Sequence, residues 1–202
     1  MDMAHNPREA GLHLSRPVQR DVQDRPLEWR QDPRHLSVDE IRLARTKLGV
    51  ERFSGPVRGL LVGECPGENT DEDMPLFPLR PTSAAGRLMD MSGLEPGEYL
   101  GCLYRRNVCY RRWTNAEARQ TARYIMSSLF DHKNLFVVLC GQRVAEAFEV
   151  RTDFWRLGKL ESRNCYTVIP HPSGLNRIYN DPSAREQTRL WVRFAALDEA
   201  AS

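Results

Sequence analysis

Short apolar runs alternate with amphipathic segments along most of the chain. Four runs, bounded by glycine, proline or polar residues, have the length of buried strands: 57–63, 103–110, 134–140 and 166–169. The segments between them repeat apolar residues every three or four positions, which predicts helices. Strands that alternate with helices in this way predict an α/β fold, a three-layer α/β/α sandwich with a central, mainly parallel four-stranded sheet.

Helix-start signals mark where several of the helices begin. Ser37 with Glu40, and Thr114 with Glu117, have the spacing of capping boxes. Pro182 follows an aspartate and stands at a favourable first helical position. Besides the helix that Thr114 begins, we expect helices over 37–49, 82–92, 96–103 and 142–148, and from 182 onward.

The N-terminal segment differs in composition from the rest of the chain. Residues 1–35 contain four prolines and one aromatic residue, Trp29, with balanced charge. This composition favours an irregular extension. Residues 36–202 are enough for a single domain that buries a core.

Composition excludes several classes of protein. With 41% hydrophobic and 28% charged residues, the chain has the balance of a globular protein. It has no apolar run of membrane-spanning length and no apolar stretch behind the N-terminus, so we expect no membrane partner and a cytoplasmic location. The five cysteines are scattered, without a C-x-x-C pair, which predicts free thiols and no zinc site. Only three of the 29 basic residues are lysine; arginine suits phosphate forks, although GC-rich coding gives the same bias.

Two loops at the carboxyl ends of expected strands carry candidate chemistry, because ligands bind at this edge of a parallel sheet. The first expected strand ends in GECPG at 63–67, a tight turn that directs Glu64 toward the crevice. The last ends in PHPSGLNR at 170–177, where two prolines restrict His171. Either loop alone could be an ordinary turn. Their joint occurrence carries the interpretation.

In this order the two segments resemble the first and last motifs of the uracil-DNA glycosylase superfamily. Relatives with a glutamate form have approximately G-E-A-P-G in the first motif, and H-P-S before a DNA-penetrating loop in the last. Intervening segments also fall where that family has a helix start, a base-reading strand and a strand-turn-helix: AAGRL at 84–88, RRNVCYRR at 105–112 and VVLCGQRVAEAF at 137–148. The resemblance covers about residues 57–195 and implies that 36–202 is a glycosylase-like domain. It implies an enzyme that removes a flipped-out pyrimidine from DNA and leaves an abasic site.

The resemblance also implies roles for individual residues. Hydrolysis of the N-glycosidic bond places positive charge on the sugar and negative charge on the departing base. Glu64 would position or deprotonate the attacking water, and His171 would hydrogen-bond the pyrimidine O2. Asn107 matches the base-reading asparagine, although an asparagine there could equally cap a strand end. The other base-binding candidates are Gly63, Cys65 and Phe77.

A glycosylase that everts its base must also fill the gap in the duplex. Leu175 is the natural wedge, and Arg177 is placed to hold phosphate or the orphaned base. Ser173 resembles the serine with which the family contacts phosphate. Further DNA-binding candidates are Asn176, Arg111 and Arg112, the last two in a basic region with Arg105, Arg106, Arg119 and Arg123. Some of these arginines are expected only to solvate a helix face.

Three features depart from the family pattern. Cys65 stands where relatives have Ala, Asn or Asp, and we expect it to fill the turn rather than act as a nucleophile. No cysteine precedes it, so we expect no iron-sulfur cluster and no other metal or cofactor. Phe77 is the aromatic nearest to the expected base-stacking position, but its register does not match. The substrate is therefore expected to be uracil or a C5-enlarged pyrimidine such as the glucosylated hydroxymethylcytosine of phage DNA, so a role in repair and one in phage defence both stay open.

Two alternatives to a glycosylase stay open. A DNA-binding or base-sensing protein could keep the fold without turnover, although Glu64 and His171 argue against it. A nucleotide-binding enzyme could use the 63–67 turn for phosphate, but the turn lacks the lysine and hydroxyl pair of a P-loop. Single- or double-stranded DNA is the expected partner, and the chain is expected to act as a monomer.

Overall fold

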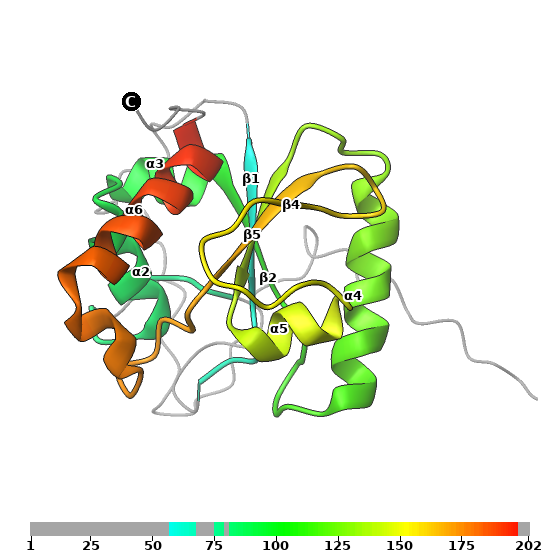
Figure 1. The fold of residues 1–202 in the computed structure, drawn as a ribbon, viewed down its shortest axis with the longest axis horizontal. Helices are drawn as coiled ribbons and strands as arrows, with labels where there is room; N and C mark the ends of the chain where they lie inside the picture. The colour runs from blue at the N-terminus through cyan, green and yellow to red at the C-terminus, as the bar shows by residue number, and fades with distance from the viewer. Residues whose placement is uncertain (1–56, 68–74, 79–80, 198–202) are drawn as a thin grey trace, which may run out of the picture.

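The structure is a computed structural model that describes residues 57–67, 75–78 and 81–197. Strands and helices alternate along these residues (Figure 1). The expected extension over 1–35 and the expected helix over 37–49 lie outside the described residues.

A central sheet lies between the helices (Figure 1). Within the described residues it has five strands, in the order β2-β1-β3-β5-β4. The strands are β1 (Gly59–Gly63), β2 (Leu103–Asn107), β3 (Phe136–Cys140), β4 (Gly158–Lys159) and β5 (Cys165–Ile169). All neighbours are parallel except β4 and β5, which pair antiparallel. The expected α/β class with a mainly parallel sheet is therefore confirmed. The expected count of four strands is wrong, because β4 has only two residues and no apolar run to mark it.

Burial along the strands follows their position in the sheet. Every residue of β1 and β3 is buried, as expected for central parallel strands covered on both faces. The edge strand β2 alternates between buried and more exposed positions and ends at Asn107, three residues earlier than expected. The chain still follows β1 past that point, because Val108 and Cys109 donate backbone hydrogen bonds to the carbonyl oxygens of Gly63 and Glu64, at 3.0 and 2.9 Å.

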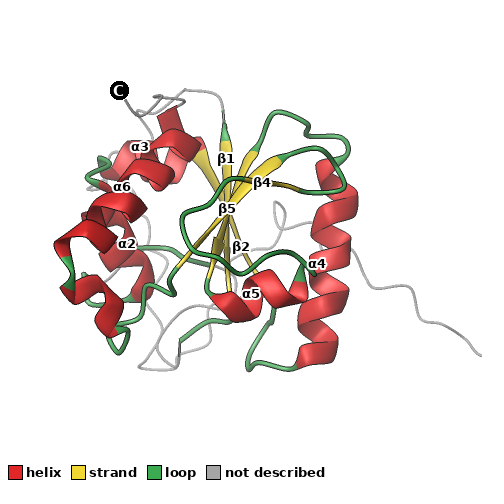
Figure 2. Ribbon diagram, viewed as in Figure 1, coloured by secondary structure: helices red, strands yellow, loops and turns green. Residues whose placement is uncertain are grey.

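Helices cover both faces of the sheet (Figure 2). One face carries α2 (Ala84–Ser92), α3 (Pro96–Cys102) and α6 (Pro182–Leu197), and the other carries α4 (Asn115–Leu129) and α5 (Gln142–Ala147). Thr114 caps α4 as expected, accepting from the Glu117 backbone N–H at 3.3 Å. The Glu117 carboxylate instead accepts from the Tyr110 N–H at 2.7 Å, which ties the β2–α4 loop to the helix. A short 3-10 helix, η2 (Arg177–Asn180), was not expected.

One apolar core lies on each side of the sheet. Val62 and Val137 face α4 and α5, whereas Leu61 and Val138 face α2, α3 and α6. This alternation is the period of two that strand geometry imposes on successive side chains. None of the helices in the described ranges combines the length and apolar character needed to cross a bilayer.

Candidate functional site

The carboxyl ends of three neighbouring strands bring two distant residues together. Glu64 follows β1, Gly141 follows β3 and His171 lies just after β5. A Cβ built on Gly141 would stand 3.3 Å from Oε1 of Glu64 and 3.3 Å from Cβ of His171. Because β3 lies between β1 and β5, Gly141 occupies the space between the two side chains. The carboxylate and the imidazole that the sequence pointed to therefore share one site.

Arg143, in the first turn of α5, orients the Glu64 carboxylate. Its Nη1 donates to Oε2 of Glu64 at 3.3 Å, and the side chain of Glu64 is only 16% exposed. The guanidinium of Arg143 also lies 4.1 Å from the centroid of the Trp113 ring, a cation–π contact that helps to fix it. Trp113 is itself held, since its indole N–H donates to Oδ1 of Asn115 at 2.7 Å. The carboxylate thus has one oxygen bound to Arg143 and the other directed toward Gly141.

The surroundings of His171 disfavour its cationic form. Burial is the largest cause that lowers the pKa of His171; the Glu64 charge raises this pKa, and the Arg143 charge lowers it. The net direction is downward from 6.5, so the imidazole is mainly neutral at neutral pH. A neutral imidazole keeps one N–H that can donate to a ligand.

The loop that carries His171 is held by side chains that come after it. Nδ2 of Asn176 donates to the carbonyl oxygen of His171 at 3.0 Å, and Oδ1 of Asn176 accepts from the Ile178 N–H at 3.2 Å. The Tyr179 hydroxyl donates to the Pro170 carbonyl oxygen at 2.5 Å. Asn176, expected as a DNA contact, uses both ends of its amide inside the protein and so braces the loop.

Asn107 lies against the backbone that leads into Glu64. It pairs with Gly63 across β2 and β1, and its Oδ1 is 2.6 Å from the position that a Cβ on Gly63 would take. Only glycine at 63 leaves room for this amide. The Leu76 side chain packs on the same spot, 3.3 Å away. Phe77 follows it and is partly buried against the core under α2, α3 and α6.

Cys65 is half-buried beside the carboxylate. Burial is the largest cause that raises the pKa of its thiol, and the Glu64 charge adds to it. A protonated thiol is a poor nucleophile. The Cys65 side chain packs against the core on the side of α4 and α5. All five cysteines are free. Among the described residues, no group of three or more His, Cys, Asp or Glu side chains could hold a metal ion.

The loop after His171 presents an apolar tip to solvent. The side chain of Leu175 is 92% exposed, although leucine is ordinarily buried. Arg177 is exposed and Ser173 half-buried on the same loop. The guanidinium of Arg87, from α2, packs directly against Gly174 on one flank of the tip. The expected wedge therefore projects from a supported loop.

The basic region near the site divides into surface and structural arginines. Arg111 and Arg112 are exposed in the β2–α4 loop, and Arg111 lies 5.7 Å from the centroid of the Tyr110 ring. Arg105 is different, because its Nη1 donates to the carbonyl oxygens of Tyr99, Leu100 and Leu103 at 2.8 to 3.2 Å. Arg105 therefore holds α3 to β2 through its Nη1.

Sequence reasoning missed three residues near the carboxyl ends of the strands: Arg143, Trp113 and Arg87. The sequence predicts a strand-turn-helix around Arg143 but no role for it. A basic residue one turn past the carboxyl end of a central strand is the signal that points to it. Nothing in the local sequence marks the contacts of Trp113 and Arg87.

Comparison of the sequence with family models and with curated proteins gave no match.

Proposed function

We propose that this protein is a DNA glycosylase that hydrolyses the N-glycosidic bond of an everted pyrimidine nucleotide and leaves an abasic site. One observation carries the proposal: Glu64 and His171 meet on either side of Gly141 at the carboxyl edge of the sheet. The reaction needs an anion beside the sugar and a hydrogen-bond donor beside the departing base. The site offers one of each.

The two groups suit different halves of the reaction. Arg143 binds Oε2 of Glu64, so Oε1 is the oxygen that can position a water molecule and offset positive charge on the sugar. The mainly neutral imidazole of His171 donates to the pyrimidine O2 as negative charge builds there. The N-glycosidic bond breaks with its electron pair leaving on the base. Water supplies the new hydroxyl on the sugar, and its other proton passes to Oε1 of Glu64.

Neighbouring residues complete the site. The amide of Asn107, packed on Gly63, has both an acceptor and a donor for a pyrimidine edge. Leu175 is exposed enough to occupy the gap that an everted base leaves in a duplex. Ser173, Arg177, Arg111 and Arg112 supply hydroxyl and cationic groups for the phosphate backbone. The protein is proposed to act as a cytoplasmic monomer on DNA.

The base is proposed to be uracil or a pyrimidine enlarged at C5. The test incubates the protein with single- and double-stranded oligonucleotides that contain uracil, and with glucosylated phage DNA. Heating in alkali then converts abasic sites to strand breaks. Matched DNA without uracil, and DNA of the phage sequence that contains unmodified cytosine, are the controls. Breaks in one modified substrate and in neither control are expected. Intact DNA in every arm, together with retained binding, would instead favour the base-sensing alternative.

A further inference from the structure

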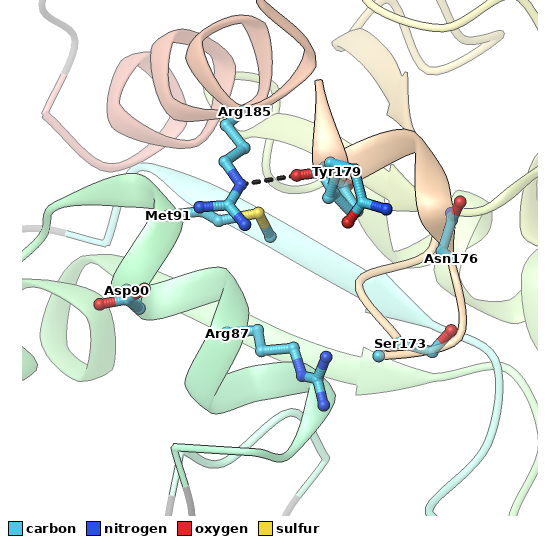
Figure 3. A pocket seen from close by; sticks show the side chains of 9 residues that line it. Arg87, Asp90, Met91, Ser173, Asn176, Tyr179 and Arg185 are labelled. Atoms are coloured by element: carbon cyan, nitrogen blue, oxygen red, sulfur yellow. Dashed lines mark hydrogen bonds between the residues drawn. The ribbon is translucent and has the colours of Figure 1, made fainter. Parts of the chain in front are cut away.

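A polar groove lies on the flank of the 171–176 loop, between this loop, α2 and α6 (Figure 3). Its volume is about 160 Å³. Cavities of this size hold a ligand as large as benzene, and a phosphate group is no larger. Two arginines line it, Arg87 from α2 and Arg185 from α6, with the hydroxyl-bearing Ser173 on the opposite wall. The groove is separate from Glu64, which does not line it.

The orientation of the Arg87 guanidinium is fixed by hydrogen bonds to one backbone carbonyl and by packing on Gly174. Its Nε and Nη2 both donate to the Thr82 carbonyl oxygen at 3.0 Å. Its guanidinium fills the space where a Cβ on Gly174 would stand, so residue 174 must be glycine for the fork to lie there. Figure 3 shows the side chain reaching from α2 toward Ser173. Within the described residues, Nη1 of Arg87 has no hydrogen-bond partner.

Arg185 is held in a similar way. Its Nε donates to the Tyr179 carbonyl oxygen at 2.6 Å, as the dashed line in Figure 3 shows. Its two terminal nitrogens have no hydrogen-bond partner in the described part of the chain. Asp90 is the acidic residue among those lining the groove, and its carboxylate points away from Arg87 and Ser173 (Figure 3). Neither arginine is paired with it, so the groove keeps a net positive charge.

We propose that this groove binds a backbone phosphate of the DNA strand that enters the site, an inference that rests on the proposed function. A guanidinium whose Nε is already bound to a carbonyl keeps terminal N–H groups for phosphate oxygens, and its fixed orientation lowers the entropy lost on binding. Gly174 connects Ser173 in the groove wall to the exposed Leu175. A strand held here is therefore positioned beside the wedge while its everted nucleotide occupies the Glu64–His171 site.

The test measures DNA binding as a function of salt. The full chain with Glu64→Gln, which leaves the DNA intact, is titrated against a fluorescent single-stranded oligonucleotide at several sodium chloride concentrations. The logarithm of the binding constant falls linearly with the logarithm of the salt concentration. For a single strand, each phosphate contact adds about 0.7 to the steepness of this line. Arg185→Gln should weaken binding and lower this slope by about that amount, for any sequence. Arg185→Lys keeps the charge without the fork, so it should restore the slope but only part of the affinity.

Arg163→Gln is the matched control. Arg163 is exposed in the turn before β5, so it lies at the amino end of this strand, whereas the groove lies beside the loop that follows the strand. The Arg163→Gln variant loses the same charge as Arg185→Gln. The salt dependence of DNA binding by Arg163→Gln should equal that of the chain that carries Glu64→Gln alone. Equal slopes for Arg185→Gln and Arg163→Gln, with unchanged thermal midpoints, would overturn the proposal. Inorganic phosphate binding that Arg185→Gln abolishes, without any change in the DNA slope, would assign the groove to a small anion and overturn it as well.

Base release by the wild-type protein is measured in parallel, so the two proposals can fail separately. A slope lowered by Arg185→Gln without base release from any substrate keeps the phosphate groove and removes the glycosylase. Base release together with an unchanged slope keeps the glycosylase and removes the groove.

Discussion

Arg143 and Glu64 form an ion pair across the carboxyl edge of the sheet, with Nη1 of Arg143 3.3 Å from Oε2 of Glu64. The pair joins the first turn of α5 to the loop after β1, and the ring of Trp113 supports the guanidinium. The pair affects a third group as well. Glu64 raises the pKa of His171 and Arg143 lowers it, so the two charges oppose each other at the imidazole. The protonation of His171 therefore depends on Arg143.

Replacing Arg143 should make His171 more basic. In Arg143→Gln the Glu64 charge is no longer opposed, while burial of the imidazole is little changed. The pKa of His171 should rise relative to wild type, measured by NMR titration of the imidazole C–H signals. Arg163→Gln, far from the site, should leave this pKa unchanged. A lower or equal pKa in Arg143→Gln would contradict the coupling.

The lowered pKa of His171 also predicts how stability depends on pH. Below about pH 6.5 the unfolded chain binds a proton at this histidine more readily than the folded protein does. The free energy of unfolding should therefore fall as the pH drops from about 6.5 through the lower folded-state pKa. Urea unfolding at several pH values measures this slope. His171→Gln should flatten it; a slope equal to that of wild type in this variant would remove the explanation.

The sequence could predict the sheet and the meeting of the two loops, because both follow from local pattern. GECPG and PHPSGLNR each terminate an apolar run, and parallel strands place such ends at one edge. For Gly141 the sequence predicts only a turn into a helix. Its position between Glu64 and His171 depends on the strand order, in which β3 lies between β1 and β5.

Other features depend on contacts that no local pattern records. Arg143 and Glu64 are 79 positions apart, and their pairing requires the folded sheet. Arg87 meets Gly174 only because α2 packs beside the loop after β5. The two residues of β4 are too few to show any periodicity, and their pairing with β5 exists only in the folded sheet.

Removing either group of the site should abolish base release without preventing DNA binding. Glu64→Gln keeps the shape of the side chain but cannot accept a proton, and His171→Ala removes the donor to the base. General acid–base groups contribute about 10²- to 10⁴-fold, so each variant should lose at least about 10²-fold in single-turnover rate. Anisotropy measures the binding constant for DNA, which should stay near that of wild type. An unchanged rate in either variant would remove that residue from the mechanism.

Glycine at position 141 should be needed both for the backbone conformation there and for the arrangement of Glu64 and His171. Its φ is +114°, and a Cβ there would stand 3.3 Å from Oε1 of Glu64. Gly141→Ala should lower the free energy of unfolding by about 1–3 kcal/mol and also reduce base release, because the carboxylate or the imidazole must shift. Gly93→Ala is the matched control, with φ of +63° and nothing within 4 Å of its Cβ. It should be destabilised through its backbone and yet retain full activity. Equal activity losses, after correction for the unfolded fraction, would show that Gly141 does not act through the site.

Leu175 should matter more for paired than for single-stranded DNA. A base in a duplex must lose its stacking and pairing, at a cost of a few kcal/mol, before it reaches the site, and an inserted side chain offsets that loss. Leu175→Ala should therefore slow base release from duplex DNA strongly and from a single strand little, measured as single-turnover rates on the same sequence in both forms. Leu157→Ala serves as the control, because Leu157 is also a largely exposed leucine, 60% accessible, on the segment before β4. It should change neither rate. If Leu175→Ala slowed both forms equally, Leu175 would be a general contact of the loop with DNA, and the insertion step would have to be assigned to another residue.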